Sequence, residues 1–298
     1  MHKSPFVWDK YSDQPHIITD KKFKKLQKKR FLLEYLKMLI VFMIIFPISF
    51  VWQFLMCYPK AKMQLGIGVN LDKGDVQYDL VDELGVKELL VRIPLWDIAR
   101  IDEYVDFAKG FGSDKNIMIN ILQDREHVDN LELLRTDVKI IFRKFQSISS
   151  EYQIGNATNR TKWGFFAVSE YLNFYQVAQQ VKDQHFPTLK LIGPSVIDFE
   201  YYYTVSSLFN LKNIKFDKVS SLLYVDRRGA PDKRQYGFSF KNKINLLASM
   251  VHLSTKTNNE IYITEANWPL ENTAPYAPTS EKECVSESDY SQYMQDYI

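Results

Sequence analysis

The stretch NEIYITEANWP, residues 259–269, decides how this chain is interpreted. Residues 261–264 alternate apolar and β-branched side chains, a pattern typical of a β-strand. A carboxylate, an amide and an indole follow at once, in Glu265, Asn267 and Trp268. In a barrel of parallel strands, such a glutamate would stand at the strand's carboxyl end as a nucleophile beside an aromatic ring on which a sugar could stack. The simpler interpretation, a strand whose last polar residue caps a loop, is left open by these residues alone.

The composition is that of a folded protein. The 298 residues are 46% apolar and 25% charged, enough for one large α/β barrel or two ordinary domains. The net charge of +2 is unevenly spread: residues 1–30 hold nine Lys and Arg against three Asp, and the remainder holds 29 basic and 33 acidic residues. A nucleic-acid-binding protein is expected to carry its basic excess on the folded body, so nucleic acid is excluded as a partner.

Metal and cofactor sites are not indicated. Cys57 and Cys284 lie far apart, and the five histidines are scattered without ligand spacing. The glycines of GIG, residues 66–68, lack the third glycine and the helix start of a dinucleotide-binding loop. We therefore expect no cofactor and no metal.

The N-terminal region has the features of a membrane anchor. Seven of the ten residues 21–30 are basic, and residues 38–59 contain no charge over 22 positions, which is roughly 33 Å of helix. The lysine excess before this run predicts a cytoplasmic N-terminus and a body on the other side of the inner (cytoplasmic) membrane. The predicted parts are a cytoplasmic basic tail at 1–37, an uncleaved single-pass anchor at 38–59 and a barrel domain at 60–298. A buried core helix is the alternative for 38–59.

Beyond residue 60, strand-like runs alternate with helix-like stretches. We expect strands at 66–71, 88–94, 116–122, 151–154, 188–192, 218–225 and 260–264, each followed by a helix. This order predicts a parallel sheet wrapped by helices, and its natural closure is a (β/α)8 TIM-type barrel. No eighth strand follows the last predicted helix, residues 286–298, so we expect that the domain is truncated at its C-terminus.

The expected carboxyl ends of the strands carry amides, carboxylates, arginines and aromatic rings. This mixture suits sugars, whose hydroxyls need polar partners and whose C–H faces pack on rings. Loops are polar in most proteins, so this enrichment indicates sugar binding only where a specific sequence motif accompanies it. The residues that we expect to bind carbohydrate are Arg92, Asn120, Asn156, Trp163, Tyr224 and Trp268.

One of these ends resembles a known family. IGNATNRTKW, residues 154–163, is similar to the IGNEPN motif of the (β/α)8 glycoside hydrolases that carry one glutamate on strand four and another on strand seven. The resemblance implies that Asn156 binds the sugar 2-hydroxyl and that Glu265 is the nucleophile. It also implies that Tyr224 hydrogen-bonds the nucleophile and that Arg92 holds it ionised.

The chain departs from that family at Ala157, which stands where the general acid/base glutamate belongs. Alanine cannot transfer a proton, and loss of the acid removes a rate factor on the order of 10² to 10⁴. Three alternatives remain: an inverting geometry with a more distant pair, no catalysis, or a substitute acid. The substitute acids considered are Glu200, Asp198, Asp124 and Asp226, with Glu200 preferred because strand five neighbours strand four.

A looser resemblance to membrane-anchored bacterial proteins linked to envelope polysaccharides supplies the substrate class. The sequence thus predicts a membrane-anchored glycoside hydrolase-like protein that acts on or binds cell-envelope polysaccharide. Its partners would be carbohydrate and, through the N-terminal helix, the lipid bilayer. The alternative is a catalytically inactive carbohydrate-binding pseudoenzyme that kept the cleft.

Overall fold

The computed structural model describes residues 6–9, 14–56, 64–225, 229–268, 270–271 and 284–297. Its centre is a seven-stranded sheet in which every neighbouring pair is parallel and the strands follow one another in chain order. A parallel sheet whose strands follow one another in chain order is typical of a TIM-type barrel. The strands are β3 (Gly66–Val69), β4 (Glu88–Pro94), β5 (Asn116–Leu122), β6 (Glu151–Ile154), β7 (Lys190–Ile197), β8 (Lys218–Leu222) and β9 (Ile261–Ile263).

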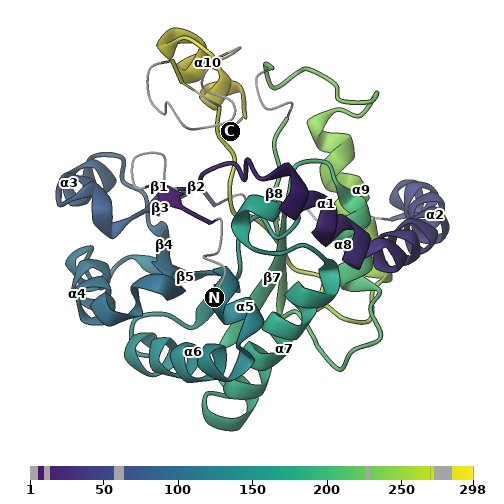
Figure 1. Ribbon diagram of the computed structural model, residues 1–298. Helices are drawn as coiled ribbons and strands as arrows, with labels where there is room; N and C mark the ends of the chain where they lie inside the picture. Colours follow the sequence, from purple (N-terminus) through teal and green to yellow (C-terminus); the bar gives the residue numbers. More distant parts are fainter. Residues whose placement is uncertain are drawn as a thin grey trace.

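The connections between the strands are helical and cover the outside of the sheet (Figure 1). They are α3 (Val76–Glu83), α4 (Ile101–Gly110), α5 (Arg125–Asp129), α6 (Leu131–Phe145), α7 (Val168–His185), α8 (Tyr201–Leu208) and α9 (Phe240–Leu253), with α10 (Glu287–Tyr297) after β9. Three short 3₁₀ turns lie at Leu71–Lys73, Leu95–Arg100 and Thr161–Trp163. The fold is therefore the predicted α/β barrel without an eighth strand in the part of the chain that the structure describes.

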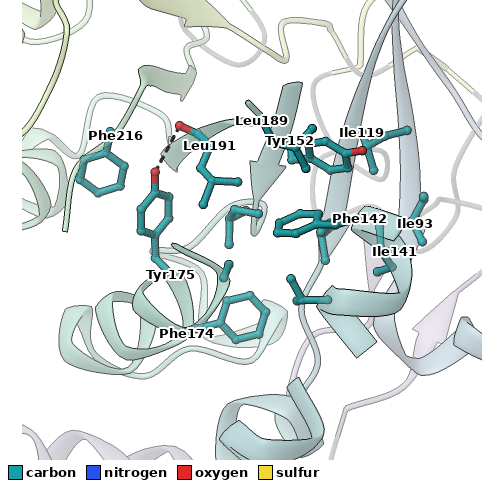
Figure 2. Close-up of a cluster of buried hydrophobic side chains, with 14 of the residues drawn as sticks. Ile93, Ile119, Ile141, Phe142, Tyr152, Phe174, Tyr175, Leu189, Leu191 and Phe216 are labelled. Carbon is teal, nitrogen blue, oxygen red and sulfur yellow. Dashed lines mark hydrogen bonds between the residues drawn. The ribbon is translucent and has the colours of Figure 1, made fainter. Parts of the chain in front are cut away.

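The hydrophobic core fills the layer between the strands and helices α6 and α7. Figure 2 shows Phe142 of α6 and Phe174 of α7 facing Tyr152 of β6 and Leu191 of β7. These side chains have no more than 1% of their surface exposed, and the Tyr175 hydroxyl donates to the Leu191 carbonyl. Burial of this aromatic layer fixes the helices on the sheet, so the strand ends are presented by a rigid frame.

Most predicted element boundaries are confirmed within three residues, and β7 is the main exception. It runs to Ile197, five residues beyond the predicted end, because Gly193, Pro194 and Ser195 look like a turn in the sequence. The structure keeps them in the strand with a register shift against β8 between Pro194 and Val196. Proline and glycine are accommodated in strands at such irregularities.

The N-terminal region, predicted as a basic tail and an anchor, contains regular structure. Trp8–Asp9 (β1) pairs with Gln14–Pro15 (β2), α1 covers Lys21–Arg30, and α2 covers Leu32–Leu55. Of the described helices, α2 is long and apolar enough to cross a membrane, by length and composition. It lies on the outer side of α8 and α9 (Figure 1). The predicted end of the anchor at 57–59 falls outside the described residues.

Candidate active site

Glu265 follows β9 at the carboxyl end of the sheet, and two partners hold its carboxylate. The Arg92 guanidinium donates to Oε2 at 2.8 Å, and the Tyr224 hydroxyl donates to Oε1. Arg92 belongs to β4, the second strand in the sheet order, and Glu265 follows β9, the last, so the ion pair crosses the mouth of the curled sheet. The Arg92 and Glu265 side chains are 18% and 21% exposed, which leaves the pair reachable from solvent.

Tyr224 supplies a neutral hydroxyl at this point. Burial first, and then the nearby Glu265 charge, raise the pKa of Tyr224 well above its ordinary value of 10. The phenol therefore stays protonated and remains a donor to the carboxylate over the whole physiological range. Lys243, itself buried, donates to the Tyr224 carbonyl at 3.1 Å and fixes the backbone that carries the ring.

A row of polar side chains extends from Arg92 into the barrel. The strand register pairs Arg92 with Asn120 and Asn120 with Gln153. Residues paired in register point to the same face of a sheet. Since Arg92 reaches Glu265 across the mouth, Asn120 and Gln153 also face the barrel interior, where both are at most 1% exposed.

Asn156 lies directly beyond this row. Its Oδ1 accepts from Asn120 Nδ2 at 3.3 Å and from Gln153 Nε2 at 3.2 Å, while its backbone N–H donates to Gln123 at 2.9 Å. Within the described chain, its buried Nδ2 has no hydrogen-bond partner, and neither has the Oδ1 atom of Asn120. A buried amide with an unused donor is costly unless something binds it, so this amide cluster has capacity for a further polar group.

Ala157 is buried at 1% exposure and adopts a positive φ of 45°. Its side chain offers no proton donor, and the loops after β6 and β7 carry a charged cluster. There Arg160 forms ion pairs with both Asp198 and Glu200, and Asn159 donates to Glu200 at 2.8 Å. One guanidinium is thus shared by two carboxylates, and the three groups together carry one net negative charge.

Of the other two acids considered in place of Ala157, the structure describes Asp124. Asp124 caps the start of α5 by accepting from the His127 backbone N–H, and it also contacts the His127 ring at 2.8 Å. It is therefore committed to a structural contact. Asp226 lies outside the described residues.

Three tryptophans form an aromatic wall beside the cluster of Arg160, Asp198 and Glu200. Trp163, predicted to bind sugar, is only 7% exposed because Trp8 covers it, with ring centroids 5.7 Å apart. Trp8 also packs on Trp96 at 4.7 Å, and Trp96 remains 40% exposed. Trp8 packs against a small cluster that includes Ala157. Trp8 could not be found by a search of strand ends, because it precedes the barrel by more than fifty residues.

Trp268 needs a correction. The sequence suggests a stacking ring beside Glu265, but the indole is 5% exposed and its N–H donates to the Gly229 carbonyl at 2.8 Å. Its ring packs against Tyr290 and Tyr293 of α10, at 6.3 and 5.6 Å. Trp268 therefore anchors the C-terminal helix, and its faces are closed to a ligand.

No group of three or more His, Cys, Asp or Glu side chains that could hold a metal ion occurs among the described residues. The arrangement at the mouth consists of a paired carboxylate, amides, a shared arginine and indoles. Such groups can bind hydroxyls and C–H faces.

No protein-family model matches this chain, and no curated protein matches its sequence. Solved structures do resemble it. A monomeric β-xylosidase from Caulobacter crescentus CB15 is 14% identical with a TM-score of 0.52, over 69% of this chain and 52% of that chain. A family 39 glycoside hydrolase from the gut symbiont Bacteroides cellulosilyticus WH2 is 11% identical with a TM-score of 0.51, over 78% and 52%.

The chain thus spans about half the length of these solved relatives. At such low identity the likeness concerns the fold alone. The shared fold is a parallel α/β barrel, of which the described residues form seven strands.

Proposed function

We propose that this protein is a membrane-associated glycosidase of cell-envelope polysaccharide, with Glu265 as its nucleophile. The observation that carries the proposal is the Glu265 carboxylate, which receives the Arg92 guanidinium and the Tyr224 hydroxyl at the mouth of the barrel. An ionised carboxylate held by two donors is oriented for attack on an anomeric carbon. Asn156, Asn120 and the aromatic wall around Trp163 and Trp96 would hold the sugar.

The proton for the leaving oxygen has to come from a residue other than Ala157. Glu200 is our candidate, because it follows β7, the strand next to the one that precedes Ala157, and lies with Asp198 on the same Arg160 guanidinium. The Glu200 side chain is 26% exposed against 9% for Asp198, so Glu200 is the more accessible of the two to a substrate.

A carbohydrate-binding protein without turnover is the second candidate. Ala157 favours it directly, since the usual acid is absent, and both Glu200 oxygens already accept hydrogen bonds from Arg160 and Asn159. In that case the mouth would bind sugar through its amides and indoles, and the Arg92–Glu265 pair would act as a polar contact.

Aryl glycosides with good leaving groups separate the two candidates, because they need little protonation. A panel that includes an aryl β-xyloside should be hydrolysed by the full chain, and Glu265→Gln should reduce the rate on the order of 10³-fold or more. Glu271→Gln, an exposed position on the same segment, is the matched control and should leave the rate unchanged. Sugar binding without hydrolysis of any member would support the binding protein instead.

The substitute acid is tested by substrate choice. Glu200→Gln should slow cleavage of natural glycans on the order of 10²-fold while cleavage of activated aryl glycosides changes little. If Asp198→Asn shows that difference and Glu200→Gln does not, Asp198 is the acid.

Membrane association rests on α2. The sequence predicts that this helix crosses the bilayer with the N-terminus in the cytoplasm and the barrel outside it. That orientation is a prediction, and the contacts that α2 makes with the barrel argue against it.

A further inference from the structure

Helix α2 is held against the barrel along its whole length. In its first turn, Glu34 accepts from the Ser169 backbone N–H and hydroxyl at 2.6 Å each. Near its last turn, the Trp52 indole donates to His252 at 3.2 Å. Between them, Ser49 is fully buried and its carbonyl accepts from Ser249 at 2.8 Å. These contacts extend over most of the helix, so the barrel occupies one entire side of α2.

The segment before α2 also stays on the barrel. Trp8 packs on Trp96 and Trp163, and Phe23 of α1 packs on Phe166 at a centroid distance of 5.4 Å. A helix of 24 residues is about 36 Å long, so a crossing α2 would carry this segment to the opposite membrane surface. The segment before α2 and α2 itself both contact the barrel, and the two sets of contacts cannot form together if α2 crosses a bilayer.

The outward side of α2 is an exposed apolar face. Its apolar side chains recur at helical spacing and are 49–76% exposed: Leu33, Leu36, Ile40, Met43, Ile44 and Val51. Lys37 is the one charged residue in that face. A helix apolar on all sides is stable in water only when all sides are covered, and here the protein covers one of them.

The surroundings of this face match an anionic lipid surface. The adjoining α1 has seven basic residues in ten and no acidic residue, while the chain after residue 30 has an excess of acidic residues. A groove of about 530 Å³ opens where α1 meets α2, with Arg30 and Lys37 beside the apolar side chains of Leu33, Leu172 and Phe209. Basic groups bordering an apolar face are the arrangement that binds phospholipid headgroups and buries their upper acyl chains.

We propose that α2 lies in the plane of the membrane surface, with its outward face in the lipid and α1 on anionic headgroups. The N-terminal segment and the barrel then lie on the same side of the membrane. The mouth, with Trp8 at its wall, faces the same compartment as the N-terminus. This inference concerns attachment and holds whether or not Glu265 is catalytic.

Cysteine labelling tests the orientation. With Cys57 and Cys284 replaced by serine, single cysteines at Thr19 and Thr188, both exposed, are treated with a membrane-impermeant maleimide in spheroplasts and in inside-out vesicles. The proposal places both positions on one side of the membrane. It therefore expects both to react in one of the two preparations and neither to react in the other. Labelling of Thr19→Cys and Thr188→Cys from opposite sides would establish a crossing helix and overturn it.

Vesicle flotation tests the lipid contact. Ile40→Asp combined with Ile44→Asp should lower binding to vesicles of phosphatidylcholine and phosphatidylglycerol at least about tenfold, because two side chains leave the lipid. Leu80→Asp with Leu84→Asp, an exposed apolar pair of the same spacing in α3 and at its C-cap, is the matched control and should bind normally. Circular dichroism confirms that both variants are folded.

The charge contribution is tested with the same vesicles. Lys24→Glu with Lys28→Glu should reduce binding to the anionic vesicles and leave the weak binding to pure phosphatidylcholine unchanged.

Sedimentation of the α2 variant, Ile40→Asp with Ile44→Asp, tests a different occupant of the face. If this variant converts a dimer to a monomer and binds vesicles as before, the face is an interface between two copies and the proposal is wrong.

Discussion

At the scale of single residues, the carboxylate of Glu265 and its two donors are the feature from which a function can be argued. Glu265 lies 173 residues after Arg92 and 41 residues after Tyr224, yet the three side chains meet at one point. The sequence could suggest these three because each lies among the last three residues of an expected strand or directly after one. It could not show that Trp268 is buried, because its partners in α10 are outside the strand pattern.

Tyr224→Phe should lower turnover of an aryl glycoside roughly tenfold to 100-fold, since one hydrogen bond to a charged oxygen is removed. Because burial and the Glu265 charge raise the Tyr224 pKa, the wild-type rate should show no loss from ionisation of this phenol below pH 10. The measurement is kcat/KM against pH for both proteins. Tyr236→Phe, at an 85% exposed position, should match the wild type; an equal loss there would remove the special role of Tyr224.

Trp96→Ala and Trp268→Ala should separate sugar binding from folding. Trp96 is 40% exposed at the aromatic wall, so its loss should weaken glycan binding with little effect on stability. Trp268 is buried against α10, and its loss should cost about 3–5 kcal/mol of local packing and release residues 284–297 to protease. Limited proteolysis and isothermal titration give the two readouts, and the opposite assignment of effects would contradict these roles.

At the scale of elements, periodicity was sufficient for most of the barrel. The predicted bounds of β4, β5 and β6 agree with the structure, because each strand is a short run of apolar residues between polar loops. The extension of β7 was missed because strand pairing overrides the turn preference of Gly193–Ser195. The docking of α2 was missed because hydrophobicity measures length and composition and contains no information about which face is covered.

His127 joins α5 to α6 and should make stability depend on pH. Burial lowers its pKa, but the contacts with Asp124 and Asp137 outweigh burial, and the net pKa is raised above 6.5. The folded protein therefore binds this proton more tightly than the unfolded chain. The added stability is fully present below about pH 6.5 and is lost as pH rises through the folded-state pKa.

Urea denaturation between pH 5.5 and 9 measures this effect. The wild type should lose stability over the window above pH 6.5, and His127→Gln should be less stable at low pH with a flatter profile. A variant whose profile keeps the full slope would assign the pH dependence to other groups.

At the scale of the whole molecule, the N-terminal region and the barrel form one body. The predicted division into tail, anchor and barrel, at residues 37/38 and 59/60, followed the charge-free run between Lys37 and Lys60. In the structure, Trp8 packs at the mouth and α2 lies on α8 and α9. Removal of α2 should therefore expose the apolar surfaces of α8 and α9 as well as abolish the proposed membrane contact.

The central claim is that Glu265 attacks a sugar, and covalent trapping tests it most directly. An activated 2-deoxy-2-fluoro glycoside slows release of a glycosyl-enzyme, so mass spectrometry of the digested full chain locates the ester. The account predicts one adduct of the sugar's mass on the peptide that contains Glu265, and none in Glu265→Gln. An adduct on another carboxylate, or bound sugar with no adduct in the wild type, would contradict it.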